Sequence, residues 1–175
     1  MTTDTTQRLL QPHPDLPLTL TEVGDGRPVL VLHGGGGPAT VTGIVDHFTA
    51  NPRVFAPTHP GWEGTPRPDW FSGVDDLAIT YLDLLEDHDL RDVLVLGSSF
   101  GGWVASEMAV RDRGHRISPL VLLDAIGPEI PGHEVRMPDS GGPGHHPGDH
   151  TGQDAERPSP QRVGPPRSAV EAMPA

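Results

Sequence analysis

The stretch Val93-Leu-Val-Leu-Gly-Ser-Ser-Phe-Gly-Gly102 decides the fold, because it joins an apolar run to a glycine-rich turn and a helical pattern. Residues 92–96 have the apolar character of a buried parallel strand, and residues 100–110 are predicted to form a helix. Between them, residues 97–101 read Gly-Ser-Ser-Phe-Gly and satisfy G-x-S-x-G at a strand-to-helix junction. We therefore predict a sharp turn that lifts the Ser99 hydroxyl out of the sheet.

A serine on such a turn needs small residues two positions away on each side, because the strand and the helix nearly touch there. Gly97 and Gly101 meet this requirement. The helix that follows points its first amides toward negative charge that develops beside Ser99. The alternative is a glycine-rich helix start that serves close packing alone. The strand before the turn and the helix after it favour Ser99 as a nucleophile.

The rest of residues 15–130 alternates apolar strands with amphipathic helices. Strands are predicted over residues 16–23, 28–32, 53–56 and 117–123, and helices over residues 39–50 and 74–90. This alternation implies right-handed crossovers between parallel strands. We therefore predict an α/β fold with a mostly parallel, doubly wound sheet, preceded by a flexible N-terminus at residues 1–14.

A second glycine-rich motif, His33-Gly-Gly-Gly-Gly-Pro38, follows the predicted strand 28–32. In a hydrolase, glycines here let backbone N–H groups turn toward an oxyanion, and the amide of the residue after the nucleophile, Phe100, supplies a further donor. His33 itself belongs to the end of the strand, and a structural role is expected for it.

The same glycines also match a dinucleotide-binding fingerprint, since Gly34, Gly36 and Ala39 fit G-x-G-x-x-A. That function requires an acidic residue near the end of the next strand, to hold a ribose. Residues 57–59, which follow that strand, read Pro-Thr-His and offer no carboxylate. A phosphate-binding P-loop requires a lysine, and the chain has none.

Taken in this order, the motifs HGGGGP (33–38) and GSSFGG (97–102) resemble those of the α/β-hydrolase-fold superfamily of esterase-like serine hydrolases. The loop THPGWEGTPRPDW (58–70) is similar to the loop after the fourth strand in esterase-like and carbon–carbon-bond hydrolase-like members. The resemblance covers residues 15–130. It implies hydrolysis of an ester or related acyl bond in a small molecule, without a cofactor.

The resemblance also implies roles for individual residues. Ser99 is the nucleophile, and the amides of Gly35 and Phe100 form the oxyanion hole. A serine at this position argues against the haloalkane dehalogenase and epoxide hydrolase branches, which carry aspartate there. The residues expected to contact substrate are Gly34, Gly36, His59 and Trp62, although a tryptophan in such a loop serves packing equally well.

The remaining catalytic groups of the superfamily are harder to place. Asp124 ends the predicted strand 117–123, where some members carry the catalytic acid, and it is the candidate here. None of the ten histidines lies in the context expected for the base. His133, His145, His146 and His150 cluster near the C-terminus, but their spacing does not fit a metal site.

Residues 131–175 differ in composition from the rest of the chain. They contain no Leu, Ile, Phe, Trp or Tyr, and glycine and proline supply a large share of them. Such a segment cannot bury enough apolar surface to fold, so we predict disorder. A complete domain of this fold needs about 250 residues. We therefore hypothesise a C-terminal truncation or a shifted reading frame near residue 132, which would leave strand 117–123 as an open edge through which the chain could self-associate.

Composition narrows the remaining choices. The formal charge of −12 disfavours binding to nucleic acid. The absence of cysteine excludes disulfides and thiolate metal sites, and is compatible with the cytoplasm. No segment has the length and apolarity of a membrane helix. The predicted function is thus a serine hydrolase that is catalytically incomplete in this chain. The alternatives are a non-catalytic binding module and a nucleotide-binding α/β domain.

Overall fold

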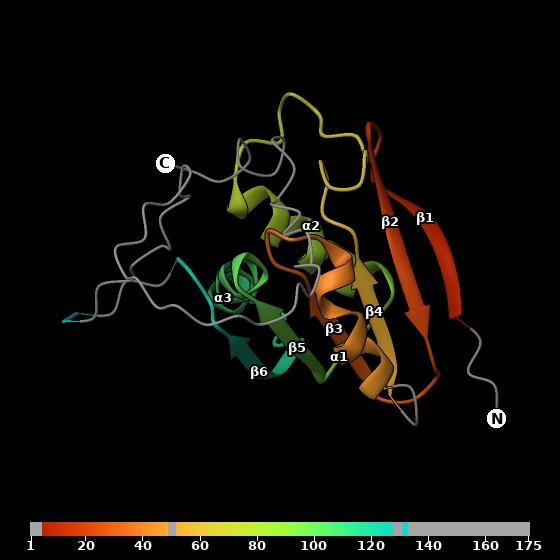
Figure 1. The fold of residues 1–175 in the computed structure, drawn as a ribbon, viewed down its shortest axis with the longest axis vertical. Helices are drawn as coiled ribbons and strands as arrows, with labels where there is room; N and C mark the ends of the chain where they lie inside the picture. The colour runs from red at the N-terminus through yellow and green to blue at the C-terminus, as the bar shows by residue number, and fades with distance from the viewer. Residues whose placement is uncertain (1–4, 49–51, 128–130, 133–175) are drawn as a thin grey trace, which may run out of the picture. The chain divides into compact units, whose positions relative to one another are not determined.

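The computed structural model describes residues 5–48, 52–127 and 131–132. The strands are β1 (Thr5–His13), β2 (Leu16–Val23), β3 (Pro28–Leu32), β4 (Arg53–Pro57), β5 (Val93–Ser98) and β6 (Ile117–Leu123). The helices are the short 3₁₀ turn η1 (Pro38–Val41), α1 (Thr42–His47), α2 (Val74–Asp87) and α3 (Phe100–Arg111), as Figure 1 shows.

The strands form one sheet in the order β1-β2-β4-β3-β5-β6. The pairs β4–β3, β3–β5 and β5–β6 are parallel, whereas β1–β2 and β2–β4 are antiparallel. The predicted α/β fold with a mostly parallel sheet is therefore confirmed. Leu32 pairs with Gly97, so the carboxyl ends of β3 and β5 lie side by side. This pairing brings the two glycine-rich motifs to the same end of the sheet.

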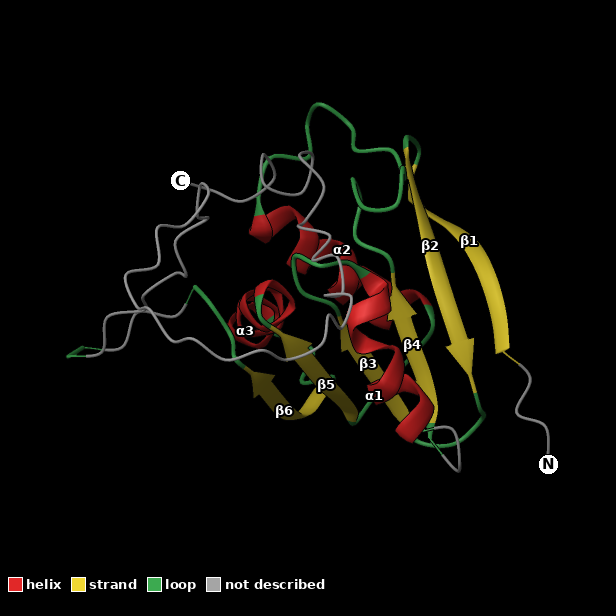
Figure 2. Ribbon diagram, viewed as in Figure 1, coloured by secondary structure: helices red, strands yellow, loops and turns green. Residues whose placement is uncertain are grey.

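Helices cover both faces of the sheet, with α1 on one face and α2 and α3 on the other (Figure 2). The alternation of side chains along β3 explains why. Leu30 and Leu32 pack into the core beneath α2 and α3, while Val29 and Val31 pack beneath α1. A strand buried on both faces in this way has to be apolar at every position, as residues 29–32 are.

The prediction of a flexible N-terminus was wrong for residues 5–13, which form the strand β1. This strand pairs antiparallel with β2 from Thr5 opposite Val23 to His13 opposite Leu16. Most of its side chains are exposed. Backbone pairing with β2 holds β1 in place, and no apolar face of β1 is buried. Its sequence therefore does not need to alternate apolar and polar residues.

The helix predicted over residues 39–50 is shorter in the structure. Its first residues form η1, α1 ends at His47, and the N–H of Phe48 closes the last turn by donating to Ile44 and Val45. Gly43 lowers the helix propensity inside this short element. The other predicted strands and helices lie where expected, with differences of a few residues at their ends.

In the sheet formed by the described residues, β6 is an edge strand. Leu122 and Leu123 remain 41% and 39% exposed although they are apolar. An uncharged apolar edge of this kind favours pairing with another strand, so self-association stays a prediction. The predicted disordered tail lies outside the described residues, apart from residues 131 and 132. Within the described segments, none of the helices has the length and apolarity required to span a membrane.

Candidate functional site

Ser99 lies on the turn between β5 and α3, directly before the first residue of the helix. Its backbone has φ 52° and ψ −114°, a conformation that residues other than glycine rarely adopt. Such backbone strain costs about 1–3 kcal/mol and persists only where surrounding contacts impose it. The Ser99 amide donates to the carbonyl of Leu123 at 2.8 Å, and the Ser99 carbonyl accepts from the Gly102 amide at 2.9 Å. Contacts to β6 and within α3 therefore hold the turn.

The residues around this turn have no room for a side chain. A Cβ atom on Gly97 would lie 2.6 Å from the carbonyl carbon of Gly101, and one on Gly102 would lie 2.5 Å from Cβ of Ala125. A Cβ atom on Gly101 would lie 2.6 Å from the carbonyl oxygen of His33. These spacings are far below normal van der Waals contact, so the strand and the helix do approach as closely as the sequence predicts.

Replacing Ser99 by glycine is expected to stabilise the fold by about 1 kcal/mol. Glycine relieves most of the strain of about 1–3 kcal/mol, and its greater freedom in the unfolded chain offsets part of the gain. Urea unfolding measures the change. Ser98→Gly is the matched control, because Ser98 lies in β5 without a positive φ and should lose stability instead. Equal changes in the two variants would contradict a strained backbone at Ser99.

The loop after β3 lies over Ser99. A Cβ atom on Gly34 would lie 3.0 Å from the Ser99 Cβ atom and 3.7 Å from its Oγ atom. Gly34 is buried, Gly35 is half-buried and Gly36 is exposed. The loop closes as a turn in which the Gly37 amide donates to the carbonyl of Gly34 at 3.0 Å. The structure thus brings the glycine-rich loop and the Ser99 side chain together.

His33 and His59 form a buried pair beneath this loop, with ring centroids 3.8 Å apart and both side chains 0% exposed. The His59 amide donates to Nε2 of His33 at 3.0 Å, so the ring proton of His33 is assigned to Nδ1, which donates to the carbonyl of Gly34 at 2.8 Å. Nε2 of His59 donates to the carbonyl of His33 at 2.9 Å. Nδ1 of His59 accepts from the Tyr81 hydroxyl at 2.5 Å. Every ring nitrogen of the pair has a partner when both rings are neutral.

Burial keeps these rings neutral. It lowers the pKa of His33 from 6.5 to about 4, against a smaller opposing effect of the hydrogen bond to Gly34. Burial also lowers the pKa of His59 well below its usual value, and the nearby His33 ring adds to the effect. Neither ring has a free nitrogen to take a proton from Ser99. The expected structural role of His33 agrees with this geometry.

The hydroxyl of Tyr81 is expected to stay protonated as long as the chain is folded, because burial raises its pKa well above 10.0. Tyr81 is the only tyrosine in the sequence, so its ultraviolet absorbance reports this group without interference from another phenol. An alkaline titration should show phenolate only together with the loss of helical circular dichroism. Ionisation near the ordinary value in a folded chain would contradict the buried hydrogen bond to His59.

The structure assigns His59 and Trp62 to the interior, whereas the sequence predicted contact with substrate. Trp62 is 2% exposed, stacks on Phe100 with ring centroids 5.5 Å apart, and donates from Nε1 to the carbonyl of Gly35 at 3.1 Å. Both side chains support the loop over Ser99 from below. Both side chains are buried rather than exposed beside Ser99, and their contact with substrate stays a prediction.

Asp124 follows β6, the strand adjacent to β5, and is exposed with a positive φ of 47°. The loop around it contacts the turn at Ser99, because the Ile126 amide donates to the Ser99 carbonyl at 3.3 Å. Residues on both sides of Asp124, Leu123 and Ile126, are thus hydrogen-bonded to the backbone of Ser99. Its role as the acid stays a prediction.

Among residues 5–48 and 52–127, no histidine is hydrogen-bonded to the Ser99 hydroxyl. His13 lies 3.8 Å from Asp83, His88 contacts Phe55, and His115 is exposed on the turn before β6. The four histidines of the C-terminal cluster lie outside the described residues. The described part of the chain thus contains the strained turn at Ser99 but no base positioned on the Ser99 hydroxyl.

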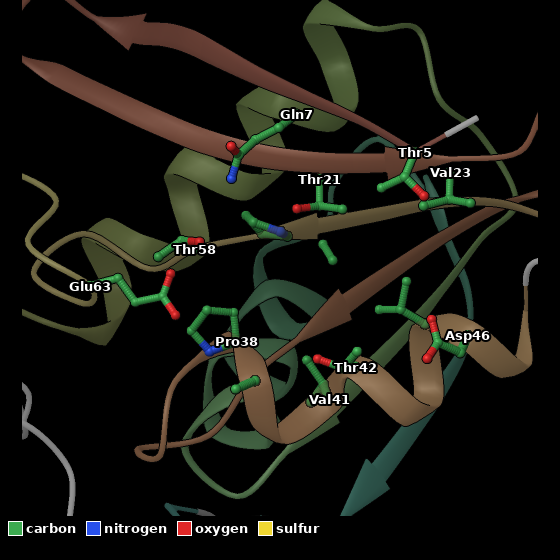
Figure 3. A pocket seen from close by; sticks show the side chains of 14 residues that line it. Thr5, Gln7, Thr21, Val23, Pro38, Val41, Thr42, Asp46, Thr58 and Glu63 are labelled. Carbon is green, nitrogen blue, oxygen red and sulfur yellow. The ribbon is translucent and has the colours of Figure 1, made fainter. Parts of the chain in front are cut away.

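A cavity of about 320 Å³ lies between the β1–β2 hairpin and the η1–α1 segment (Figure 3). Glu63 and Asp46 stand at its opposite ends in this view, and threonine side chains line the space between them. Ser99 does not line it. The cavity is therefore separate from the space in which the predicted nucleophile would act.

Residues 29–174 match the sequence profile described as "Alpha/beta hydrolase family". The chain belongs to the alpha/beta hydrolase family. Membership of this family argues against the alternative of a nucleotide-binding α/β domain. The match includes residues 131–174, and the hypothesis of a C-terminal truncation or a shifted reading frame stays a prediction.

Individual relatives of this alpha/beta hydrolase catalyse different reactions. The 2-hydroxy-6-oxo-2,4-heptadienoate hydrolase of Pseudomonas putida is 33% identical over 113 residues, 62% of this chain and 41% of the relative. A non-heme chloroperoxidase of Kitasatospora aureofaciens is 34% identical over 114 residues, 60% of this chain and 39% of the relative. The chain therefore spans about two fifths of the length of these two relatives.

Solved structures share the fold. The 2-hydroxy-6-oxo-6-phenylhexa-2,4-dienoate hydrolase of Rhodococcus sp. strain RHA1 superposes with a TM-score of 0.62 at 19% identity, over 74% of this chain and 50% of that protein. At this identity the similarity extends to the architecture alone.

The buried pair of His33 and His59 with Tyr81 could not be found from the sequence, because its members are far apart along the chain and no motif links them.

Proposed function

We propose that this chain carries the nucleophile of a serine hydrolase that cleaves an ester or a related acyl bond, with Ser99 as the attacking residue. The observation that supports the proposal most strongly is the strained backbone of Ser99, φ 52° and ψ −114°, on a turn enclosed by glycines. Strain of this kind is concentrated at functional sites. It lifts the hydroxyl beneath the Gly34 loop, where a carbonyl group of the substrate would meet it.

The chemistry follows from that placement. The Ser99 Oγ atom attacks the carbonyl carbon and loses its proton, so that a tetrahedral intermediate with a negative oxygen forms. The amides of Gly35 and Phe100 are proposed to hold this oxygen, at a helix N-terminus whose dipole favours the charge. The leaving group departs with a proton, and water then releases the acyl group from Ser99.

The described residues do not supply the base that takes the Ser99 proton. We propose that Asp124 would orient a base from beyond these residues, and that turnover by this chain alone is weak. Donors of the oxyanion hole still accelerate the reaction over water when the catalytic triad is broken. The same proposal includes a small acyl substrate and a cytoplasmic location. It also includes activity without a cofactor and without binding to nucleic acid.

The alternative is a non-catalytic module that binds an acyl compound in the same place. The observation in its favour is the missing base among residues 5–48 and 52–127. The two proposals differ in whether Ser99 becomes acylated. Acylation needs the strained nucleophile turn, whereas binding needs only the surrounding loop.

Incubation with p-nitrophenyl acetate, followed by mass spectrometry and by release of p-nitrophenol, separates the two. The hydrolase proposal predicts an acetyl group on Ser99 that forms slowly and turns over slowly, and its absence in Ser99→Ala. The binding module predicts no acetylated Ser99 and equal release from both proteins. Fast turnover that vanishes in Ser99→Ala would instead show that the base is present in this chain.

A further inference from the structure

The peptide between Gly34 and Gly35 is held by its carbonyl group. The Gly34 oxygen accepts two hydrogen bonds, one from Nδ1 of His33 at 2.8 Å and one from the Gly37 amide at 3.0 Å. Two donors that converge on one carbonyl fix the plane of its peptide far better than one donor does. The His33 ring and the Gly37 amide therefore fix the orientation of this peptide together.

That orientation also sets the direction of the Gly35 amide. The only cis peptide bond in the described chain is Ser118–Pro119, so the Gly34–Gly35 bond is trans. In a trans peptide the N–H points away from the C=O. When the carbonyl is held on the side of His33, the Gly35 N–H is directed to the opposite side. Gly34 lies directly over Ser99, since its Cβ position is 3.0 Å from the Ser99 Cβ atom.

The His33 ring is itself held in one tautomer and one orientation. Its Nε2 atom accepts the His59 amide at 3.0 Å, so only Nδ1 carries the proton that reaches Gly34. The His59 ring bridges the carbonyl of His33 and the hydroxyl of Tyr81 on α2. Tyr81 is 0% exposed, so the chain of hydrogen bonds ends in the core and not in solvent.

We propose that His33 is a positioning residue, whose Nδ1–H holds the Gly34 carbonyl and thereby aims the Gly35 amide at the oxyanion formed on Ser99. The backbone amide of His59 holds the His33 ring in the tautomer that this task requires, and the Tyr81 hydroxyl holds the His59 ring in place. The inference deepens the proposed function and rests on it, because it concerns the oxyanion donor of that same site. It assigns no proton transfer to either histidine.

The chain offers a matched pair of variants at this position. In His33→Asn the side-chain amide occupies the place of ring Nδ1 and keeps a donor for the Gly34 carbonyl. In His33→Gln the amide lies one bond further out, near the place of Nε2, and can accept from the His59 amide but cannot reach Gly34. Both variants leave a polar group of similar size in the same buried space.

The first readout is the rate at which a fluorophosphonate modifies Ser99. Loss of one oxyanion-hole donor typically slows a serine enzyme by about a hundredfold to a thousandfold. His33→Gln is therefore expected to react about a hundredfold more slowly than the wild-type chain, and His33→Asn within about tenfold of it. Equal slowing in both variants, in proportion to their loss of stability, would overturn the inference in favour of a purely structural histidine.

The second readout does not depend on the reactivity of Ser99. Heteronuclear NMR of labelled protein reports the tautomer of each histidine ring and the environment of the Gly35 amide. We expect the Nδ1–H tautomer for His33, and a Gly35 resonance that moves in His33→Gln but not in His33→Asn. The Nε2–H tautomer for His33, or equal movement in both variants, would overturn the inference. If the wild-type chain fails to react with the probe, the proposed function fails, and this measurement alone decides whether His33 orients the peptide.

Discussion

Replacing Gly101 by alanine is expected to destabilise the fold by about 3 kcal/mol, the upper end of the usual cost of overpacking. The added methyl group would lie 2.6 Å from the carbonyl oxygen of His33 and closer still to that of Leu32. Both obstacles are backbone atoms at the end of β3, so they cannot rotate out of the way as a flexible side chain can. The first turn of α3 would have to move away from the sheet, and the Ser99 turn would move with it.

Gly43→Ala is the matched control for this variant. Gly43 lies in α1, and no atom lies within 4 Å of its Cβ position. Alanine there should raise the free energy of unfolding by about 0.5–1 kcal/mol, because it is the better helix former. Urea unfolding of both variants beside the wild type gives the comparison. Similar stabilities for the two alanine variants would show that α3 and β3 do not approach as closely as described.

The second large effect is a loss of stability in mild acid. The pKa of His33 falls from 6.5 to about 4 on folding, and that of His59 also falls well below 6.5. At a pH between the folded-state pKa and the unfolded-state pKa of each ring, the unfolded chain binds more protons than the folded chain. The free energy of unfolding therefore decreases as the pH is lowered through this range. Each histidine contributes about 1.4 kcal/mol per pH unit in this window, and His33 alone contributes about 3 kcal/mol in total.

Urea unfolding at a series of pH values from neutral down to the pKa of His33 measures this slope. The loss should begin as the pH falls below about 6.5 and should stop for His33 near pH 4. In His33→Asn, one of the two titrating rings is gone, so the slope should be about half that of the wild type. A free energy of unfolding that stays constant across this range would contradict the neutral buried pair.

The sequence was informative where one local pattern determines the structure. The runs 29–32 and 93–96 are apolar at every position because both faces of their strands are covered, and this pattern separates them from surface strands. The G-x-S-x-G turn was equally predictable, because close approach of a strand and a helix demands glycine at positions 97 and 101. These two features are sufficient to predict the family fold.

Features that depend on distant partners were not predictable. The strand β1 has no hydrophobic period, since pairing with β2 holds it. His59 and Trp62 lie in a loop rich in proline and glycine, which suggested exposure to substrate. Their burial depends on Tyr81, His33 and Phe100, which belong to other elements. No local pattern reports that a loop folds back into the core.

The reaction of the folded chain with a fluorophosphonate shows directly whether Ser99 is a nucleophile held in a strained turn. Intact mass and peptide mapping identify the modified residue. We expect a single adduct on Ser99, which is lost in Ser99→Ala and forms much more slowly when the wild-type chain is unfolded in urea. Modification of other serines, or equal rates for the folded and unfolded chains, would contradict it.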